Sequence, residues 1–183
     1  MKRNCIIFLT LIIISVTALG FSGVFGAKNE LGDQTQTSQY LRIHVRAHSN
    51  DSSAQAVKYA VRDKIVEFLT PLVATYHSQS EAVDGIAQNL DKITRVAENA
   101  LQSHGYHYGA SAKIKSETFP TRVYDGYTLP AGEYVALIVE LGEGKGDNWW
   151  CVVYPPLCFS SPKGNQIIYK SKILEIIERF KKN

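Results

Sequence analysis

The sequence lacks the short motifs that mark the common nucleotide-binding and catalytic sites. Gly142-x-Gly144 does not continue as a dinucleotide-binding fingerprint, because Asp147 stands where the third glycine would be. Lys145 is followed by glycine instead of Ser or Thr, which excludes a phosphate-binding loop. Neither G-x-S-x-G nor H-E-x-x-H occurs. We therefore predict no catalytic residue, no metal ion and no cofactor.

A strong charge of one sign is also missing. The 183 residues carry 20 Lys and Arg against 17 Asp and Glu. Lys2 and Arg3 lie at the extreme N-terminus, and without them 20 − 2 = 18 basic residues face the 17 acidic ones. So balanced a chain gives little support for nucleic-acid binding. At 45% hydrophobic and 20% charged residues, it is expected to be neither disordered nor wholly membrane-embedded.

The first 26 residues contain no charge after Arg3. An apolar core over 5–19 is followed by small residues, and Val24-Phe25-Gly26 before Ala27 suits a signal-peptidase site. The sequence therefore predicts a signal peptide over 1–26 and export of the rest. An uncleaved anchor is the alternative, because the uncharged run approaches the roughly 20 residues of a membrane-spanning helix. A polar linker is expected over 27–39.

Cysteines are scarce, and only Cys151 and Cys158 lie outside the predicted signal peptide. An even pair in an exported chain favours a disulfide. The chain would have to fold back between them, and Pro155-Pro156 can form that bend. Two reduced, buried cysteines are one alternative. A cysteine nucleophile is another, although nothing in the sequence places a histidine beside either sulfur.

Residues 41–48 alternate between apolar and basic side chains, which predicts a half-buried strand. Arg42, His44, Arg46 and His48 share one side, which we expect to be solvated, with an anion- or partner-binding face as the alternative. His44 and His48 are four residues and so about 13 Å apart on a strand, too far to share a metal ion.

The remaining periodicities predict an α+β fold in one domain over 40–160. Apolar residues at helical spacing indicate a helix over 52–72 that begins with a Ser52/Gln55 capping box. A second, antiparallel helix is expected over 78–105, with a Ser78/Glu81 capping box and Gly105 at its end. Strands are expected over 108–119 and 133–141, with a short one within 121–128. Residues 133–141 are apolar on both sides, which indicates a central strand in a mostly antiparallel sheet.

The C-terminal segment 161–183 is expected to be a basic amphipathic tail. One helical stripe comprises Ile173, Ile176, Ile177 and Phe180. The tail could dock on its own domain, on a partner or on a membrane surface.

The most unusual stretch, 142–160, holds both tryptophans and the one Pro-Pro pair. Its three alternate glycines indicate a turn or a close backbone approach. We expect it to form a partner-contact surface, because large aromatic side chains anchor protein interfaces. Burial of both tryptophans in the core is the alternative. The expected contact residues are Lys145, Asn148, Trp149, Trp150, Pro155 and Pro156.

Several of these blocks resemble the stage II sporulation protein R family of endospore-forming bacteria. They begin at Leu41 (LRIHVRAHSNDS), Gln55 (QAVKYAVRD), Pro130 (PAGEY) and Gly142 (GEGKGDNWWCVVYPPLCF). The resemblance covers about 41–159, with His48 as a minor departure where the family more often has Asn. It implies a signalling protein, made in the forespore and exported into the space between the forespore and mother-cell membranes. There it would activate a membrane-embedded aspartic protease of the mother cell that processes a pro-sigma factor, sigma-E. A secreted cysteine-dependent hydrolase acting on wall peptide or a protease pro-segment is the alternative function.

Overall fold

The computed structural model describes residues 37–124, 127–157, 176–180 and 182. The predicted signal peptide and nearly all of the linker lie outside these residues. Strands and helices are segregated along the chain, which confirms the predicted α+β class. The elements are β1 (Leu41–Arg46), α3 (Ser52–Val73), α4 (Gln79–Ala87), α5 (Leu90–Ser103), β2 (Ala110–Phe119), β3 (Arg122–Tyr124), β4 (Tyr127–Leu129), β5 (Gly132–Leu141) and β6 (Asn148–Tyr154).

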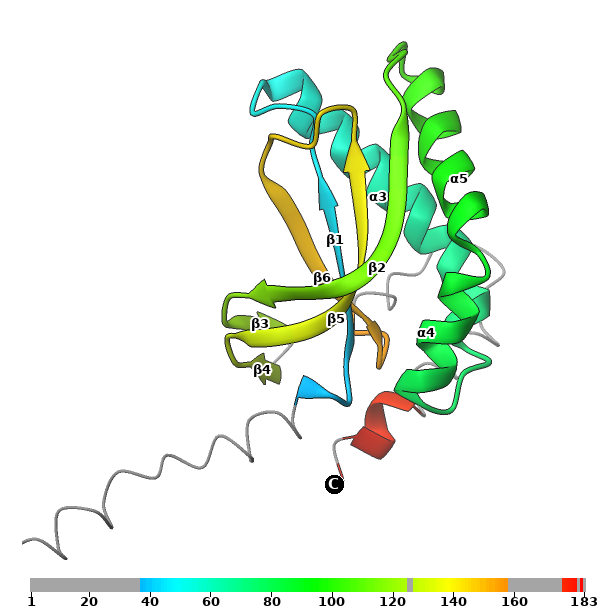
Figure 1. Cartoon of the computed structure of the whole chain (residues 1–183), viewed down its shortest axis with the longest axis vertical. Helices are drawn as coiled ribbons and strands as arrows, with labels where there is room; N and C mark the ends of the chain where they lie inside the picture. The colour runs from blue at the N-terminus through cyan, green and yellow to red at the C-terminus, as the bar shows by residue number, and fades with distance from the viewer. Residues whose placement is uncertain (1–36, 125–126, 158–175, 181, 183) are drawn as a thin grey trace, which may run out of the picture. The chain divides into compact units, whose positions relative to one another are not determined.

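Four strands form one mixed sheet in the order β2-β5-β1-β6 (Figure 1). β1 is parallel to β5, and the two outer pairs are antiparallel. Ile43 lies opposite Leu137 on one side and Cys151 on the other. The predicted mostly antiparallel sheet and the central position of β5 are both confirmed. β3 and β4 form a separate hairpin beside the bent end of β2.

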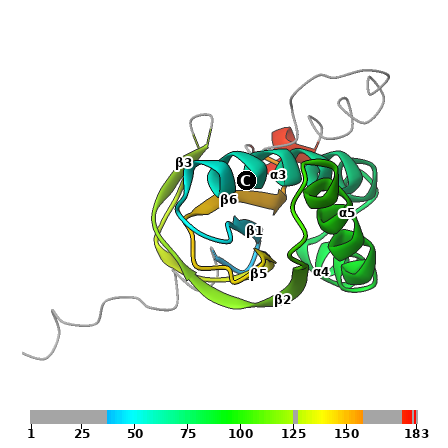
Figure 2. The ribbon, with the colours of Figure 1, turned by 90° about the horizontal axis from the view of Figure 1, so that it is seen from above.

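The three helices gather on one side of the strands (Figure 2). Their buried apolar residues meet alternate residues of β1, β5 and β6 in the main core, in which Ile43, Ile65 and Leu137 are 0% exposed. Alternation along a strand turns the intervening residues toward the opposite face of the sheet. That second face is the one on which the candidate site lies.

The helix ends confirm two predictions. The Glu81 backbone N–H donates to Ser78 Oγ at 3.1 Å, as expected for an N-cap. At the end of α5, Gly105 has φ +80° and the Tyr106 N–H donates to the Leu101 carbonyl oxygen at 3.0 Å. This is a Schellman ending, in which glycine takes the left-handed position.

Two other helix predictions are wrong. The single helix expected over 78–105 is divided between α4 and α5, because the Asn89 side chain donates to the Gly85 carbonyl oxygen at 2.7 Å and ends the first helix. The expected Ser52/Gln55 capping box is also absent. The N-cap residue is Asp51, and the Gln55 amide donates to the Ser49 carbonyl oxygen at 2.9 Å.

Residues 176–180 of the predicted tail are helical and pack on the domain. Ile176 is 1% exposed, and the Phe180 ring lies 5.7 Å from that of Tyr154 and 6.3 Å from that of Tyr40. The tail was expected to dock on its own domain, on a partner or on a membrane surface, and residues 176–180 dock on their own domain. Across the ranges that the structure describes, no helix combines the length and apolar character needed to cross a bilayer.

Candidate functional site

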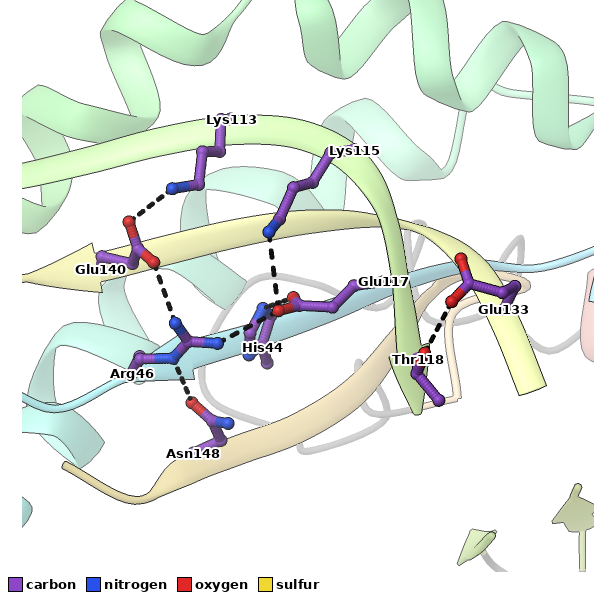
Figure 3. Close-up of polar contacts among 9 residues, drawn as sticks. All are labelled: His44, Arg46, Lys113, Lys115, Glu117, Thr118, Glu133, Glu140 and Asn148. Carbon is purple, nitrogen blue, oxygen red and sulfur yellow. Dashed lines mark hydrogen bonds and ion pairs between the residues drawn. The ribbon is translucent and has the colours of Figure 1, made fainter. Parts of the chain in front are cut away.

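The sheet face turned away from the helices carries an unusual density of charge. We call it the charged face, and its polar side chains come from all four strands (Figure 3). They are Arg42, His44, Arg46, Lys113, Lys115, Glu117, Glu140 and Asn148. The solvated face expected for β1 is wrong, because Arg42 and His44 are both 0% exposed. Side chains of β2, β3, β5 and β6 cover them.

Arg46 is the centre of an ion-pair network on this face. Its Nη1 lies 3.0 Å from Glu140 Oε1, its Nη2 3.2 Å from Glu117 Oε1, and its Nε donates to Asn148 Oδ1 at 3.1 Å (Figure 3). Lys113 Nζ adds a 2.6 Å contact with Glu140 and lowers the pKa of that carboxyl, mainly through this hydrogen bond. The network therefore links all four strands across the sheet.

His44 lies beside the network in an aromatic setting. Its Nε2 atom is 2.7 Å from Glu117 Oε2. Its ring stacks on Trp150 at 5.0 Å between centroids and 13° between planes, and meets the edge of Phe119. Burial lowers the pKa of His44, although the nearby Glu117 carboxylate acts in the opposite direction. At neutral pH this buried imidazole is therefore held neutral.

Arg42 is enclosed by three aromatic rings. Its Cζ atom lies 4.2 Å from the Phe119 centroid, 4.8 Å from that of Tyr134 and 5.8 Å from that of Tyr124. Its Nη2 donates to the Tyr124 hydroxyl at 2.8 Å. Burial lowers the pKa of Arg42, and the Tyr124 hydroxyl partly offsets this effect. No carboxylate among the described residues forms an ion pair with it.

The glycine-rich turn 142–147 fixes the start of β6 against the segment after β1. Gly142 and Gly144 have φ +55° and +61°, a region that favours glycine. A Cβ at Gly146 would collide with the Ser49 carbonyl group, and the Gly146 N–H donates to the Ala47 carbonyl oxygen at 2.9 Å. The predicted turn and close approach are both confirmed.

The six expected contact residues do not form one surface. Trp149 packs toward the helix-side core and lies 5.4 Å from the Arg62 guanidinium, whereas Trp150 lies on the charged face. Pro155 and Pro156 are buried. Asn148 bonds to Arg46, and Lys145 is 76% exposed and pairs with Glu143. Strand alternation thus separates the two tryptophans, and only Asn148 and Trp150 belong to the charged face.

The position of Cys151 in β6 gives no support to the hypothesis of a cysteine nucleophile. Cys151 is 0% exposed and lies in the helix-side core, opposite to the face that holds His44. Cys158 lies outside the described residues, so the Cys151–Cys158 disulfide stays a prediction. In the part of the chain that is described, no three His, Cys, Asp or Glu side chains converge to hold a metal ion.

The residues that sequence reasoning missed are Lys113, Lys115, Glu117 and Glu140. The signal was present in β2, where charged side chains occupy alternate positions from Lys113 to Glu117. It becomes informative only when β2 is known to lie in the same sheet as the basic positions of β1.

Comparison with known proteins identifies the family. The family model of Stage II sporulation protein R matches residues 37–163. The chain belongs to the stage II sporulation protein R family. The Stage II sporulation protein R of Bacillus subtilis (strain 168) is 32% identical to it over 165 residues, which cover 87% of this chain and 72% of that protein. The matched region includes the charged face, and the family supports a role in sporulation. No solved structure matches the chain.

Proposed function

We propose that this protein is an exported sporulation signal that binds and activates a membrane-embedded aspartic protease of the mother cell. The protease then processes the pro-form of sigma-E. The observation that carries the proposal is membership of the stage II sporulation protein R family over 37–163. The export pattern of residues 1–26 suits a site of action between the forespore and mother-cell membranes.

The charged face is the best candidate for the surface that contacts the protease. The helices leave it uncovered, and the side chains of Lys113 and Lys115 on it are 45% and 49% exposed. Exposed charges around the partly exposed Trp150 match the polar rim and central aromatic anchor of protein interfaces. Binding there leaves the helix-side core undisturbed.

The direct test is co-expression of this protein with the protease and its pro-sigma substrate in a host that does not sporulate. Cleavage of the substrate is expected only when all three proteins are present and the signal protein is exported. A version without residues 1–26 provides the control, because it stays on the wrong side of the membrane. Equal cleavage with and without the signal protein would show that it is not the activator.

The two tryptophans separate binding from folding in the same assay. Trp150→Ala removes an aromatic side chain from the charged face, so we expect it to reduce substrate cleavage. Trp149→Ala removes packing against the helix-side core, so we expect it mainly to lower the melting temperature. Circular dichroism shows whether each variant is folded. A folded Trp150→Ala protein with full activity would exclude Trp150 from the contact.

A further inference from the structure

Among the residues that the structure describes, Arg42 is the cation on the charged face that pairs with no carboxylate. The residue is 0% exposed, and its Nε and Nη1 atoms are buried without a hydrogen-bond partner. Its Nη2 donates to the Tyr124 hydroxyl, which is neutral. Buried charges in proteins are normally paired, because desolvation of a lone ion is costly. In the described residues, Arg42 is therefore a buried cation whose Nε and Nη1 donors are available to an anionic group from outside the domain.

We propose that Arg42 anchors a carboxylate-binding site, which takes an Asp or Glu side chain of the protein partner. The identity of the partner rests on the proposed function, but the chemistry of the site does not. A guanidinium presents N–H donors in a planar fork that matches the two oxygens of a carboxylate. The flanking rings of Phe119 and Tyr134, at 4.2 and 4.8 Å, favour a flat, singly charged group over a bulkier phosphate.

The Tyr124 hydroxyl occupies the position that a carboxylate oxygen of the partner would take beside Arg42. Its hydroxyl lies 2.8 Å from Arg42 Nη2, and it belongs to the β3–β4 hairpin, which shares no strand pairing with the four-stranded sheet. A two-stranded hairpin is only marginally stable by itself, so a carboxylate can displace this hydrogen bond to a neutral hydroxyl.

The charges around the site favour an acidic partner. Among the described residues, cationic side chains outnumber carboxylates on and beside the charged face: Arg42, Arg46, Lys113, Lys115 and Arg122 against Glu117 and Glu140. The two carboxylates are already engaged with Arg46 and the lysines. They therefore do not neutralise Arg42. A partner segment that contributes an Asp or Glu side chain restores the balance.

The test is a titration of the purified full chain with sodium acetate, with sodium chloride of equal ionic strength as the control. The Nε–H resonance of Arg42, identified by its loss in Arg42→Lys, reports on the site. We expect a saturable shift with acetate and none with chloride. Tyr124→Phe removes the competing hydroxyl and is expected to tighten acetate binding about threefold to tenfold, which corresponds to one neutral hydrogen bond. A response to acetate no larger than that to chloride would overturn the proposal, as would a stronger response to inorganic phosphate.

The co-expression assay then connects the site to the partner. Arg42→Lys keeps the charge but loses the planar fork, so we expect substrate cleavage to fall about tenfold or more in a protein that remains folded. Full cleavage by a folded Arg42→Lys protein would overturn the partner assignment. If wild-type protein binds acetate but never supports cleavage, the proposed function fails and the carboxylate site stands. If the wild-type protein supports cleavage but does not bind acetate, the carboxylate site fails and the proposed function stands.

Discussion

Gly146 lies where the glycine-rich turn crosses the segment that follows β1. The crossing brings two backbones into direct contact, since a Cβ at this position would meet the Ser49 carbonyl group and the Ala47 side chain. A backbone obstacle cannot rotate away as a flexible side chain can. The position therefore requires glycine for reasons of space.

We predict that Gly146→Ala lowers the free energy of unfolding by about 2 kcal/mol, within the usual cost of overpacking. Urea denaturation monitored by circular dichroism measures this loss. Gly109→Ala is the matched control, because the nearest atom to its added Cβ is Glu98 Oε1 at 3.4 Å, an ordinary contact. Equal stability of the two variants would show that the crossing is looser than described.

His44 gives the protein a defined response to acid. Its folded-state pKa is lowered by burial from the ordinary value of 6.5. Below pH 6.5 the unfolded chain therefore takes up a proton that the folded chain does not, and stability falls as the pH falls. The slope from this one group is at most about 1.4 kcal/mol per pH unit.

We predict that His44→Gln removes this contribution, since glutamine does not titrate. Thermal unfolding between pH 7 and pH 5 should show a smaller loss of stability for the variant than for the wild type. His77→Gln removes an exposed imidazole just before α4 and is the control for the substitution itself. A variant slope as steep as that of the wild type would assign the acid response to other groups.

At the scale of elements, α4 depends on its N-cap more than the longer helices do. It has nine residues, a length at which helices are marginal without caps and packing. We predict that Ser78→Ala costs about 1 kcal/mol in unfolding free energy, because the Glu81 N–H loses its acceptor. Ser80→Ala, which changes an exposed residue two positions along, should alter it by less than about 0.5 kcal/mol. Urea denaturation of both variants checks the difference.

The elements also show which parts of the structure could be predicted from the sequence. Features set by neighbours along the chain were correctly predicted, such as the Ser78 cap, the Gly105 ending and the apolar pattern of β5. Features set by contacts between distant residues were not. The buried state of Arg42 and His44 depends on Phe119 and Trp150, which alternation in β1 cannot reveal. The division of the second helix was not predicted because the residues around Asn89 continue the helical pattern. The break depends on the hydrogen bond from the Asn89 side chain to the Gly85 carbonyl oxygen, which the sequence does not reveal.

At the scale of the whole molecule, the charged face and the helices lie on opposite faces of the four-stranded sheet. Loss of positive charge from one should therefore affect partner binding without affecting the packing of the other. The lysine ends of the ion pairs Lys113–Glu140 and Lys115–Glu117 are about half exposed, and ion pairs that water reaches contribute little to stability. The two lysines are thus suitable probes of function.

We predict that the double variant Lys113→Gln/Lys115→Gln lowers substrate cleavage about fivefold in the co-expression assay, because charges at the rim of an interface speed association. The melting temperature should change little. Lys64→Gln/Lys92→Gln removes the same charge from exposed positions of α3 and α5 and should leave cleavage unchanged. Equal effects of the two double variants would point to net charge instead of the charged face.

The order of strands has a consequence for how the chain acquires its structure. Of the strands that the structure describes, β1 comes first along the chain, yet it lies between β5 and β6, which come last. Pairings so distant in sequence make folding slow. On the export route that we propose, a chain crossing the membrane with its N-terminus first would deliver β1 long before either neighbour. The four-stranded sheet could form completely only after Tyr154 had crossed the membrane. The chain would therefore stay unfolded during translocation, and the protein would become active only on the far side.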